Sequence, residues 1–254
     1  MNHILSVNTI RKEFGGLIAV KDVSFNVYEG DIQSLIGPNG AGKTTIFNLI
    51  NRFFPLTRGE IFFYNKRIDT NKSHTLSFLG LTRTFQNVRL FPDMTVLENV
   101  MVGCHPRSRA GLLSSAFRFP RIIKEEKIIR DKAFQELKFI GLERRAYERA
   151  GDLPFGEQRI LEIARGLATQ PKIILLDEPA AGLNTHETEN LAQLIKQIKG
   201  RGITVFMVEH DMGLVMDISD RVMVLNNGEK IAEGTPAEVQ NNPLVISAYL
   251  GEEI

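Results

Sequence analysis

Hydrophobic and polar residues follow two different periods along the chain, and each period predicts a different element. Short apolar runs rich in β-branched residues, such as 4–7 and 19–27, predict strands in the opening third. Apolar residues three or four apart, as at Ile129, Ala133 and Leu137, predict the buried face of a helix. The chain therefore combines an N-terminal β-rich part with a helical segment further on.

The last hundred residues alternate between the two patterns. Predicted strands at 172–176, 204–208 and 221–225 are separated by predicted helices at 188–199 and 212–219. Such alternation is typical of a doubly wound, mostly parallel sheet. In sheets of this kind, ligands bind outside the carboxyl ends of the strands.

Composition adds limits rather than a function. The chain has 254 residues, with 31 Lys and Arg against 30 Asp and Glu, so no global field attracts nucleic acid. The single cysteine, Cys104, excludes an internal disulfide and suits a reducing compartment. The N-terminus lacks the pattern of a signal peptide, and no apolar run reaches the ~20 residues that cross a bilayer. We expect a membrane role only through a partner.

A glycine-rich motif follows the short predicted strand 33–36 and precedes a predicted helix. It fits G-x-x-x-x-G-K-[ST] and consists of Gly37, Pro38, Asn39, Gly40, Ala41, Gly42, Lys43 and Thr44, with Thr45 next. Its glycines allow successive N–H groups to face one anion, and the helix start adds a positive dipole. Lys43 is expected to reach the β- and γ-phosphates, and the Thr44 hydroxyl to bind Mg²⁺. The motif predicts binding of a nucleotide without specifying its base.

Carboxylates and a histidine follow two other predicted strands. Asp177 and Glu178 come directly after the apolar run 173–176. Carboxylates are costly at the end of a buried strand unless they bind a cation or take part in a reaction. Asp177 is expected to hold Mg²⁺, and Glu178 to orient the attacking water as general base. His210 follows the strand 204–208, and we expect it to contact the γ-phosphate.

These features predict an α/β fold of the phosphate-loop NTPase type. We expect a mostly parallel sheet, an N-terminal antiparallel β part and an inserted α-helical subdomain. Within a single domain of residues 1–254, the ATP-binding core comprises 1–86 and 151–254, and the helical insertion about 87–150.

Together the motifs resemble the ATP-binding cassette family of transporter ATPases over essentially the whole chain. The resemblance implies that Phe14 stacks on adenine and that Gln86 touches Mg²⁺. The segment 153–159 resembles the family signature, in which Gly156 and Glu157 contact the ATP of a partner subunit. A head-to-tail dimer with two ATP molecules at its interface is implied. Residues 181–184 match the loop after the catalytic glutamate.

The chain departs from the family pattern at the signature. Pro154 and Phe155 stand where serine and glycine are usual, and Glu157 stands for glutamine. Because proline has neither hydroxyl nor N–H, we expect binding in trans to depend on the Gly156 backbone and the helix dipole. Asn184 replaces the usual aspartate, which is expected to alter communication between the two ATP sites.

Segment 83–91 resembles the ATPases of branched-chain amino-acid importers, and 105–126 resembles an insertion in the longer of their two subunits. This implies a second ATPase, as a heterodimer or homodimer, and two permease subunits. A periplasmic or extracellular solute-binding protein is implied as an indirect partner. Nucleic acid is not expected as a partner. The resemblance implies that the chain lies at the cytoplasmic face of the inner membrane. Residues such as Val88, Leu90 and Phe91 are expected to form the groove for the permease.

Several alternatives remain at this stage. A urea or amide importer and a lipid or lipopolysaccharide exporter would use the same ATPase chemistry. A soluble cassette ATPase normally has two cassettes or a long coiled-coil insert, whereas this chain has one phosphate loop and a short insertion. A lone phosphate-loop kinase gives no reason for the signature segment or His210.

Overall fold

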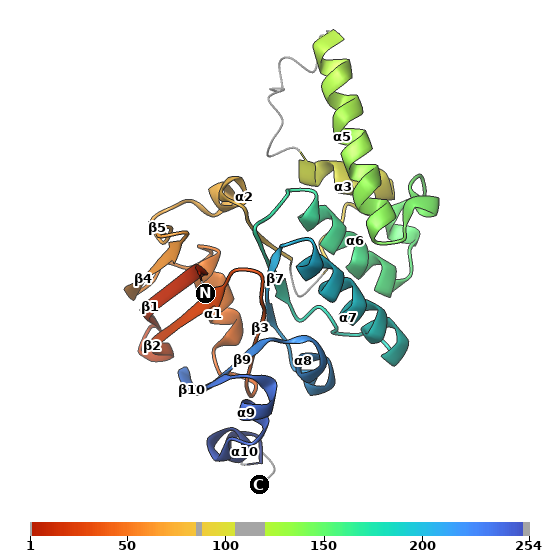
Figure 1. Cartoon of the computed structure of the whole chain (residues 1–254). Helices are drawn as coiled ribbons and strands as arrows, with labels where there is room; N and C mark the ends of the chain where they lie inside the picture. The colour runs from red at the N-terminus through yellow and green to blue at the C-terminus, as the bar shows by residue number, and fades with distance from the viewer. Residues whose placement is uncertain (1, 85–87, 105–119, 251–254) are drawn as a thin grey trace. The chain divides into compact units, whose positions relative to one another are not determined.

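The computed structural model describes residues 2–84, 88–104 and 120–250. These form two compact units, which we treat separately. The sheet unit comprises Met1–Leu76 with Lys172–Ile254, and the helical unit comprises Ser77–Pro171. Figure 1 shows the elements of both units in chain order.

The sheet unit begins with an antiparallel sheet in the order β2-β1-β4-β5. Its strands are β1 (His3–Phe14), β2 (Leu17–Tyr28), β4 (Arg58–Phe63) and β5 (Lys66–Arg67). Val23, Phe25 and Val27 of β2 are buried while Ser24 between them is exposed, as expected of a sheet with one face in the core. The predicted N-terminal antiparallel part is confirmed.

A second sheet of this unit has the strand order β10-β9-β3-β8-β7. The strands are β3 (Ile32–Ile36), β7 (Ile173–Asp177), β8 (Thr204–Val208), β9 (Arg221–Asn226) and β10 (Glu229–Gly234). The first four run parallel, and β10 returns antiparallel to β9 through a turn at Asn227-Gly228. Every residue of β3, β7 and β8 is buried, which explains the apolar runs of β7 and β8, while β3 also buries Gln33 and Ser34.

Helices of the sheet unit follow the strands, as the alternation predicts. They are α1 (Lys43–Ile50), α7 (Thr185–Gly200), α8 (Met212–Ile218), α9 (Pro236–Gln240) and α10 (Pro243–Leu250). Leu191, Leu194 and Ile198 form the buried stripe of α7. The ring of Phe206 in β8 lies 5.0 Å from Phe47 of α1 and 5.6 Å from Phe25 of β2, measured between centroids. These aromatic contacts join the two sheets around one core.

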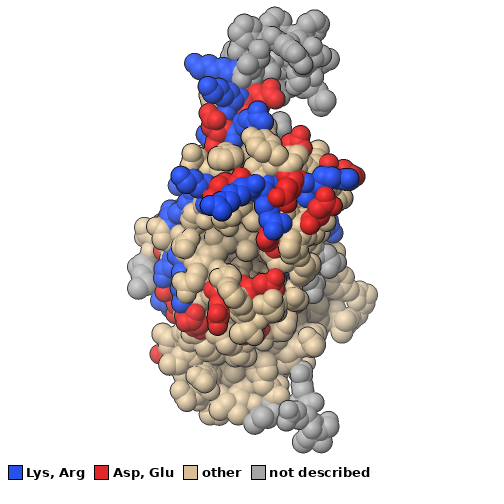
Figure 2. All heavy atoms as spheres, turned by 90° about the vertical axis from the view of Figure 1, so that its right-hand side faces the viewer, with Lys and Arg blue, Asp and Glu red and all other residues tan. Residues whose placement is uncertain are grey.

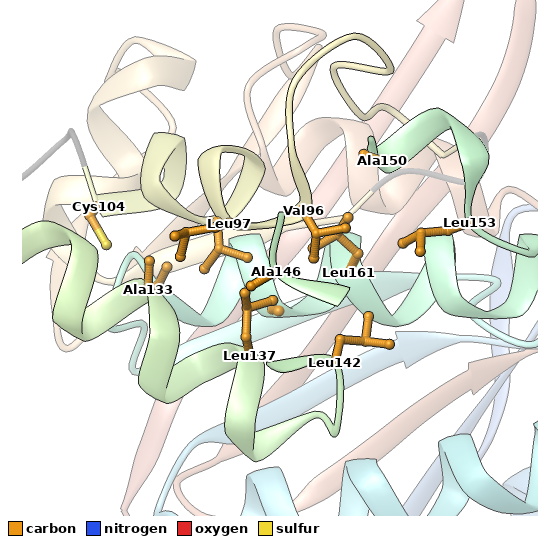
Figure 3. Close-up of a cluster of buried hydrophobic side chains, with 13 residues drawn as sticks. Val96, Leu97, Cys104, Ala133, Leu137, Leu142, Ala146, Ala150, Leu153 and Leu161 are labelled. Carbon is orange, nitrogen blue, oxygen red and sulfur yellow. The ribbon is translucent and has the colours of Figure 1, made fainter. Parts of the chain in front are cut away.

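The helical unit has its own hydrophobic core (Figure 3). Its elements are β6 (Leu81–Arg83), α3 (Val96–Cys104), α5 (Pro120–Phe139) and α6 (Phe155–Leu167), with short 3₁₀ turns at Glu143–Arg145 and Ala150–Asp152, while α2 (Leu76–Leu79) spans the boundary of the units. Leu97 of α3, Ala133 and Leu137 of α5, and Leu161 of α6 meet in this core. The predicted spacing on α5 is therefore that of a buried face.

The helical unit extends further at both ends than the insertion 87–150 that the sequence predicts. The reason at its C-terminal end is α6, whose Leu161 and Ala164 pack in the core of the helical unit. The signature residues at the start of α6 therefore belong to this unit by packing. Among the described helices, none is long and apolar enough to cross a bilayer.

Candidate functional site

The glycine-rich loop leaves β3 and enters α1 (Figure 1). At Gly37 the φ angle is 149° and at Gly42 it is 102°, both unfavourable for residues with a side chain. A Cβ atom on Gly37 would lie 2.0 Å from the Leu225 carbonyl oxygen, and one on Gly42 would lie 2.5 Å from that of Ala19. Both glycines are therefore required by close backbone approach as well as by conformation.

Backbone hydrogen bonds hold the loop from its outer side. The Ala41 N–H donates to the Pro38 carbonyl at 3.2 Å, and the Gly228 N–H donates to the Ala41 carbonyl at 3.0 Å. Gly228 in turn accepts from the Lys21 N–H of β2 at 2.8 Å. The loop thus lies against both the β9–β10 turn and the antiparallel sheet.

Lys43 places its charge inside this loop. Its Nζ atom donates to the carbonyl oxygens of Gly37 at 2.6 Å and Pro38 at 2.9 Å. Lys43 also begins α1, whose N-cap Gly42 supplies no side-chain cap. The first-turn N–H groups of a helix have no intrahelical acceptor, so cation and helix start together favour an anion here. Thr44, on the exposed side of the same turn, carries the hydroxyl predicted to bind a cation.

The predicted groups on β7 and β8 come to the same edge of the sheet as this loop. Leu35 of β3 and Asp177 of β7 both pair in register with Val208, which lies between them on β8. Gly37, Glu178 and His210 therefore follow the same level of three adjacent parallel strands. The structure brings together these three predicted parts of the site.

Asp177 and Glu178 differ in environment although they are neighbours. Asp177 is 2% exposed at the end of β7. Glu178 is half-buried and has a φ of 47°, while its N–H donates to the Val208 carbonyl at 2.9 Å. This left-handed conformation turns the chain directly after the strand.

His210 begins the turn between β8 and α8, and its side chain is 63% exposed. The preceding residue, Glu209, was not predicted from the sequence and is fully buried. Its Oε1 accepts from the Ala180 N–H at 2.7 Å, and its Oε2 accepts from the N–H groups of His210 at 3.0 Å and Asp211 at 3.3 Å. Burial raises the pKa of Glu209, and the three N–H donors oppose that rise.

Phe14 ends β1 and is 41% exposed, as suits an aromatic that stacks on a base. Its ring meets that of Phe54 edge to face, with the centroids 5.3 Å apart. The Nζ atom of Lys12 lies 4.7 Å from the Phe14 centroid and donates to the Pro55 carbonyl at 3.0 Å. This cation–π contact fixes the orientation of the ring.

The signature residues open α6 in the helical unit. Pro154 is its N-cap and provides no side-chain cap, and Gly156 lies buried in the first turn. The carboxylate of Glu157 lies 3.3 Å from Nε of Arg145, so its charge is compensated within the unit. Gln86 lies outside the described residues, as do most of the residues in the segment 105–126.

Asn184 acts as the N-cap of α7. Its side chain accepts from the Glu187 N–H at 3.0 Å, while the Glu187 carboxylate accepts from the Asn184 N–H at 2.9 Å. This is a complete capping box, for which asparagine and aspartate are equally suited. The departure at this position therefore leaves the start of the helix intact.

Fold and site together define a phosphate-loop ATPase, and comparison with known proteins gives its family. Residues 20–181 match the model of the ABC transporter family, and residues 229–254 match a model described as branched-chain amino acid ATP-binding cassette transporter. The chain belongs to the ATP-binding cassette transporter family, and like other members it is an ATPase. The resemblance inferred from the sequence is confirmed.

Two relatives illustrate the similarity. The high-affinity branched-chain amino acid transport ATP-binding protein LivG of Escherichia coli K12 is 46% identical over 250 residues, which cover 98% of each chain. BraF of Pseudomonas aeruginosa, with the same description, is 44% identical over 250 residues, again 98% of each.

Solved structures agree with the fold. The ADP conformation of MJ1267, an ATP-binding cassette of an ABC transporter, is 36% identical and has a TM-score of 0.86, with 99% of this chain and 100% of that one covered. A dimeric post-hydrolysis state of the cassette MJ0796, bound to ADP and phosphate, is 29% identical and has a TM-score of 0.77. The match covers 91% of this chain and 98% of that one. The predicted α/β fold is therefore confirmed.

Proposed function

We propose that this ATPase powers the import of branched-chain amino acids through a pair of membrane permease subunits. The observation that carries the proposal is the nearly full-length similarity to LivG, together with the match of residues 229–254 to the branched-chain model. Import of urea or short-chain amides is the alternative with the same ATPase chemistry. No side chain of an ATPase subunit needs to contact the solute, so solute identity rests on this similarity.

The phosphates of ATP bind at the loop from Gly37 to Thr45. Backbone N–H groups and the Lys43 ammonium stabilise their charge, and Phe14 stacks on adenine. Lys43 already lies across the first carbonyls of the loop, so a small rotation of its side chain suffices to reach the β- and γ-phosphates. Binding therefore exchanges backbone carbonyls for phosphate oxygens around one cation.

Mg²⁺ fits the donor set at the edge of the sheet. Hydroxyl and carboxylate oxygens of Thr44 and Asp177, with the amide of Gln86, are hard ligands of the kind this ion prefers. Within the described part of the chain, His, Cys, Asp and Glu form no cluster of three that would hold a metal by itself. That suits an ion held by one or two side chains plus phosphates and waters. When bound, it would neutralise charge that develops on the phosphate oxygens.

Hydrolysis requires a water in line with the γ-phosphate. Glu178 is the general base that orients this water, because it follows β7 at the same edge of the sheet as the phosphate loop. His210 contacts the γ-phosphate from the next strand. Both groups act on the phosphoryl oxygens and the water, and the loop keeps the nucleotide in place.

The second half of each site comes from another cassette. Gly156 and Glu157 at the start of α6 contact the γ-phosphate bound by a partner, through the Gly156 N–H and the helix dipole. Arg145 compensates the charge of Glu157 and so reduces its repulsion of that phosphate. The dimeric MJ0796 structure supports cassette dimerisation as a property of such folds. We propose a heterodimer with a shorter ATPase at the cytoplasmic face of the inner membrane, supplied indirectly by a solute-binding protein.

Co-purification from the native membrane tests this proposal. We expect the chain to be recovered with two permeases and a second ATPase, and the reconstituted complex to raise its ATP turnover when leucine, isoleucine or valine is supplied with the binding protein. Stimulation by urea or amides instead would assign the alternative solute. Recovery without any permease would refute a transport role.

A further inference from the structure

Glu209 has no part in the functions assigned so far, yet its side chain is fully buried next to the site. Its carboxylate is 0% exposed, and burying a charge of this kind is unfavourable unless hydrogen bonds compensate it. Three backbone N–H groups provide that compensation. An apolar side chain here would leave all three donors buried without this acceptor.

The three donors belong to two different loops. Ala180 lies two residues after Glu178, in the loop that leads from β7 to α7. His210 and Asp211 form the turn that leads from β8 to α8. One carboxylate therefore joins the segment that carries the general base to the segment that carries the γ-phosphate contact.

This link continues the sheet where its backbone pairing ends. The ladder between β7 and β8 reaches Asp177 and Val208, and the Glu178 N–H still donates to the Val208 carbonyl. Beyond that point the chains diverge into their loops, and the Glu209 side chain supplies the next acceptor. The Glu209 N–H also donates to the Leu35 carbonyl at 3.3 Å, which attaches the same residue to the strand before the phosphate loop.

We propose that Glu209 is a positioning residue for ATP hydrolysis, which fixes the backbone of His210 and the loop after Glu178 at one separation. This inference rests on the roles proposed above for Glu178 and His210. Glu209 acts through the backbone rather than through the imidazole, because 3.9 Å separates its Oε2 from Nδ1 of His210, too far for a hydrogen bond. The exposed ring is thus held by its main chain alone on this side.

Glu209→Gln is the first test. The amide group has one acceptor and one donor end, so its NH₂ must oppose at least one of the three N–H donors. We expect the kcat for ATP to fall about tenfold or more, because small displacements of reacting groups are costly in rate. The KM for ATP should stay within about twofold, since the phosphate loop is unchanged.

Asp220→Asn is the matched control. Asp220 Oδ2 accepts from the Ile32 N–H at 2.7 Å, so it forms the same kind of bond in the same sheet, but at the opposite edge, where β3 begins. We expect this variant to lower the thermal midpoint while its kcat stays within about twofold of wild type. An equal fall of kcat in both variants would overturn the proposal.

A double variant tests whether the effect passes through the histidine. We expect Glu209→Gln to slow the wild type but to slow the His210→Ala protein much less, because groups that act as a unit are not additive. Should Glu209→Gln fail to fold, Glu209→Asp is the second variant. Its shorter side chain keeps the charge but cannot reach the N–H groups of both loops, so we expect the same loss of kcat. A folded variant of either kind with wild-type kcat would overturn the inference.

The Glu178→Gln protein in the same assay separates this inference from the roles on which it rests. If Glu178→Gln loses turnover while the Glu209 variants do not, only the inference about Glu209 fails. If Glu178→Gln turns over at the wild-type rate, the proposed base is wrong.

Discussion

The backbone of Glu178 is held in a left-handed conformation that costs a residue other than glycine about 1 kcal/mol or more. Such strain persists only where surrounding structure enforces it. Here the bond from the Glu178 N–H to β8 and the bond from the Ala180 N–H to Glu209 enforce it from both sides. We propose that these two bonds hold the backbone of Glu178 in place for its role as general base.

Glu178→Gln should therefore retain ATP binding and lose turnover. The amide preserves the size of the side chain but cannot accept a proton, so we expect kcat to fall about 10²-fold or more with little change in ATP affinity. Single-turnover hydrolysis and nucleotide titration measure the two quantities. Glu189→Gln, on the exposed face of α7, is the control and should behave as wild type. Wild-type turnover of Glu178→Gln would remove this residue from the role of base.

At this scale, residues with a motif around them were predictable and Glu209 was not. Lys43, Asp177 and His210 each follow a recognisable strand, and the structure brings their strands to one edge. Glu209 reads in the sequence only as an acidic residue beside a histidine. Its importance comes from N–H groups of two loops about thirty residues apart in sequence, which only the tertiary structure brings together.

At the scale of elements, the N-termini of two helices are the groups proposed to bind phosphate. We propose that the start of α1 binds the phosphates in the loop and that the start of α6 binds those held by a partner subunit. Both begin without a side-chain cap, whereas α7, α8 and α9 are capped by Asn184, Asp211 and Thr235. Phosphate binding is proposed at both of these uncapped helix starts, where the first N–H groups have no acceptor.

Gly156→Asp should abolish dimerisation driven by ATP. A carboxylate in the first turn of α6 suits the helix dipole, but its charge repels the γ-phosphate of the partner site. We expect dimers of the Glu178→Gln protein, measured by light scattering with ATP, to disappear in the double variant. Gly156→Asn has a similar size without the charge and should retain more dimer. If Gly156→Asp dimerised like its parent, the first turn of α6 would not bind phosphate.

Elements were more predictable than their grouping. Strands such as β7 and β8 were evident because they are nearly continuous apolar runs, and α5 was evident from its spacing. The sequence did not show whether α6 packs in the sheet unit or in the helical unit, because its apolar stripe could face either core. Only the packing of Leu161 and Ala164 with α3 and α5 assigns it to the helical unit.

The two units have separate cores, and each presents its own surface. On the face that Figure 2 shows, basic and acidic side chains of the described residues are interspersed. Ion pairs such as Arg145 with Glu148, and Lys196 with Asp217, join opposite charges among the described residues. Charge is therefore a weak guide to a docking surface here, and exposed apolar side chains are more informative.

The segment expected to meet the permease divides into two kinds of residue. Leu90 packs against the core of the helical unit, as an ordinary core residue does. Phe91 is 45% exposed, while Asn99 holds its backbone by donating to the Phe91 carbonyl at 3.0 Å and accepting from its N–H at 2.9 Å. An aromatic side chain on a fixed backbone, with much of its surface free, is the kind of residue that anchors an interface.

Phe91→Ala should consequently uncouple transport from hydrolysis. Removal of the ring leaves both backbone bonds to Asn99, so the fold and the basal ATP turnover of the isolated chain should stay within about twofold of wild type. Loss of one interface anchor should lower solute uptake by the reconstituted importer about tenfold. Leu244→Ala truncates an apolar side chain on α10 that is more exposed, at 62%, and should leave uptake unchanged. Unchanged uptake would show that Phe91 does not meet the permease, and an equal loss of hydrolysis and uptake would show that it supports the fold instead.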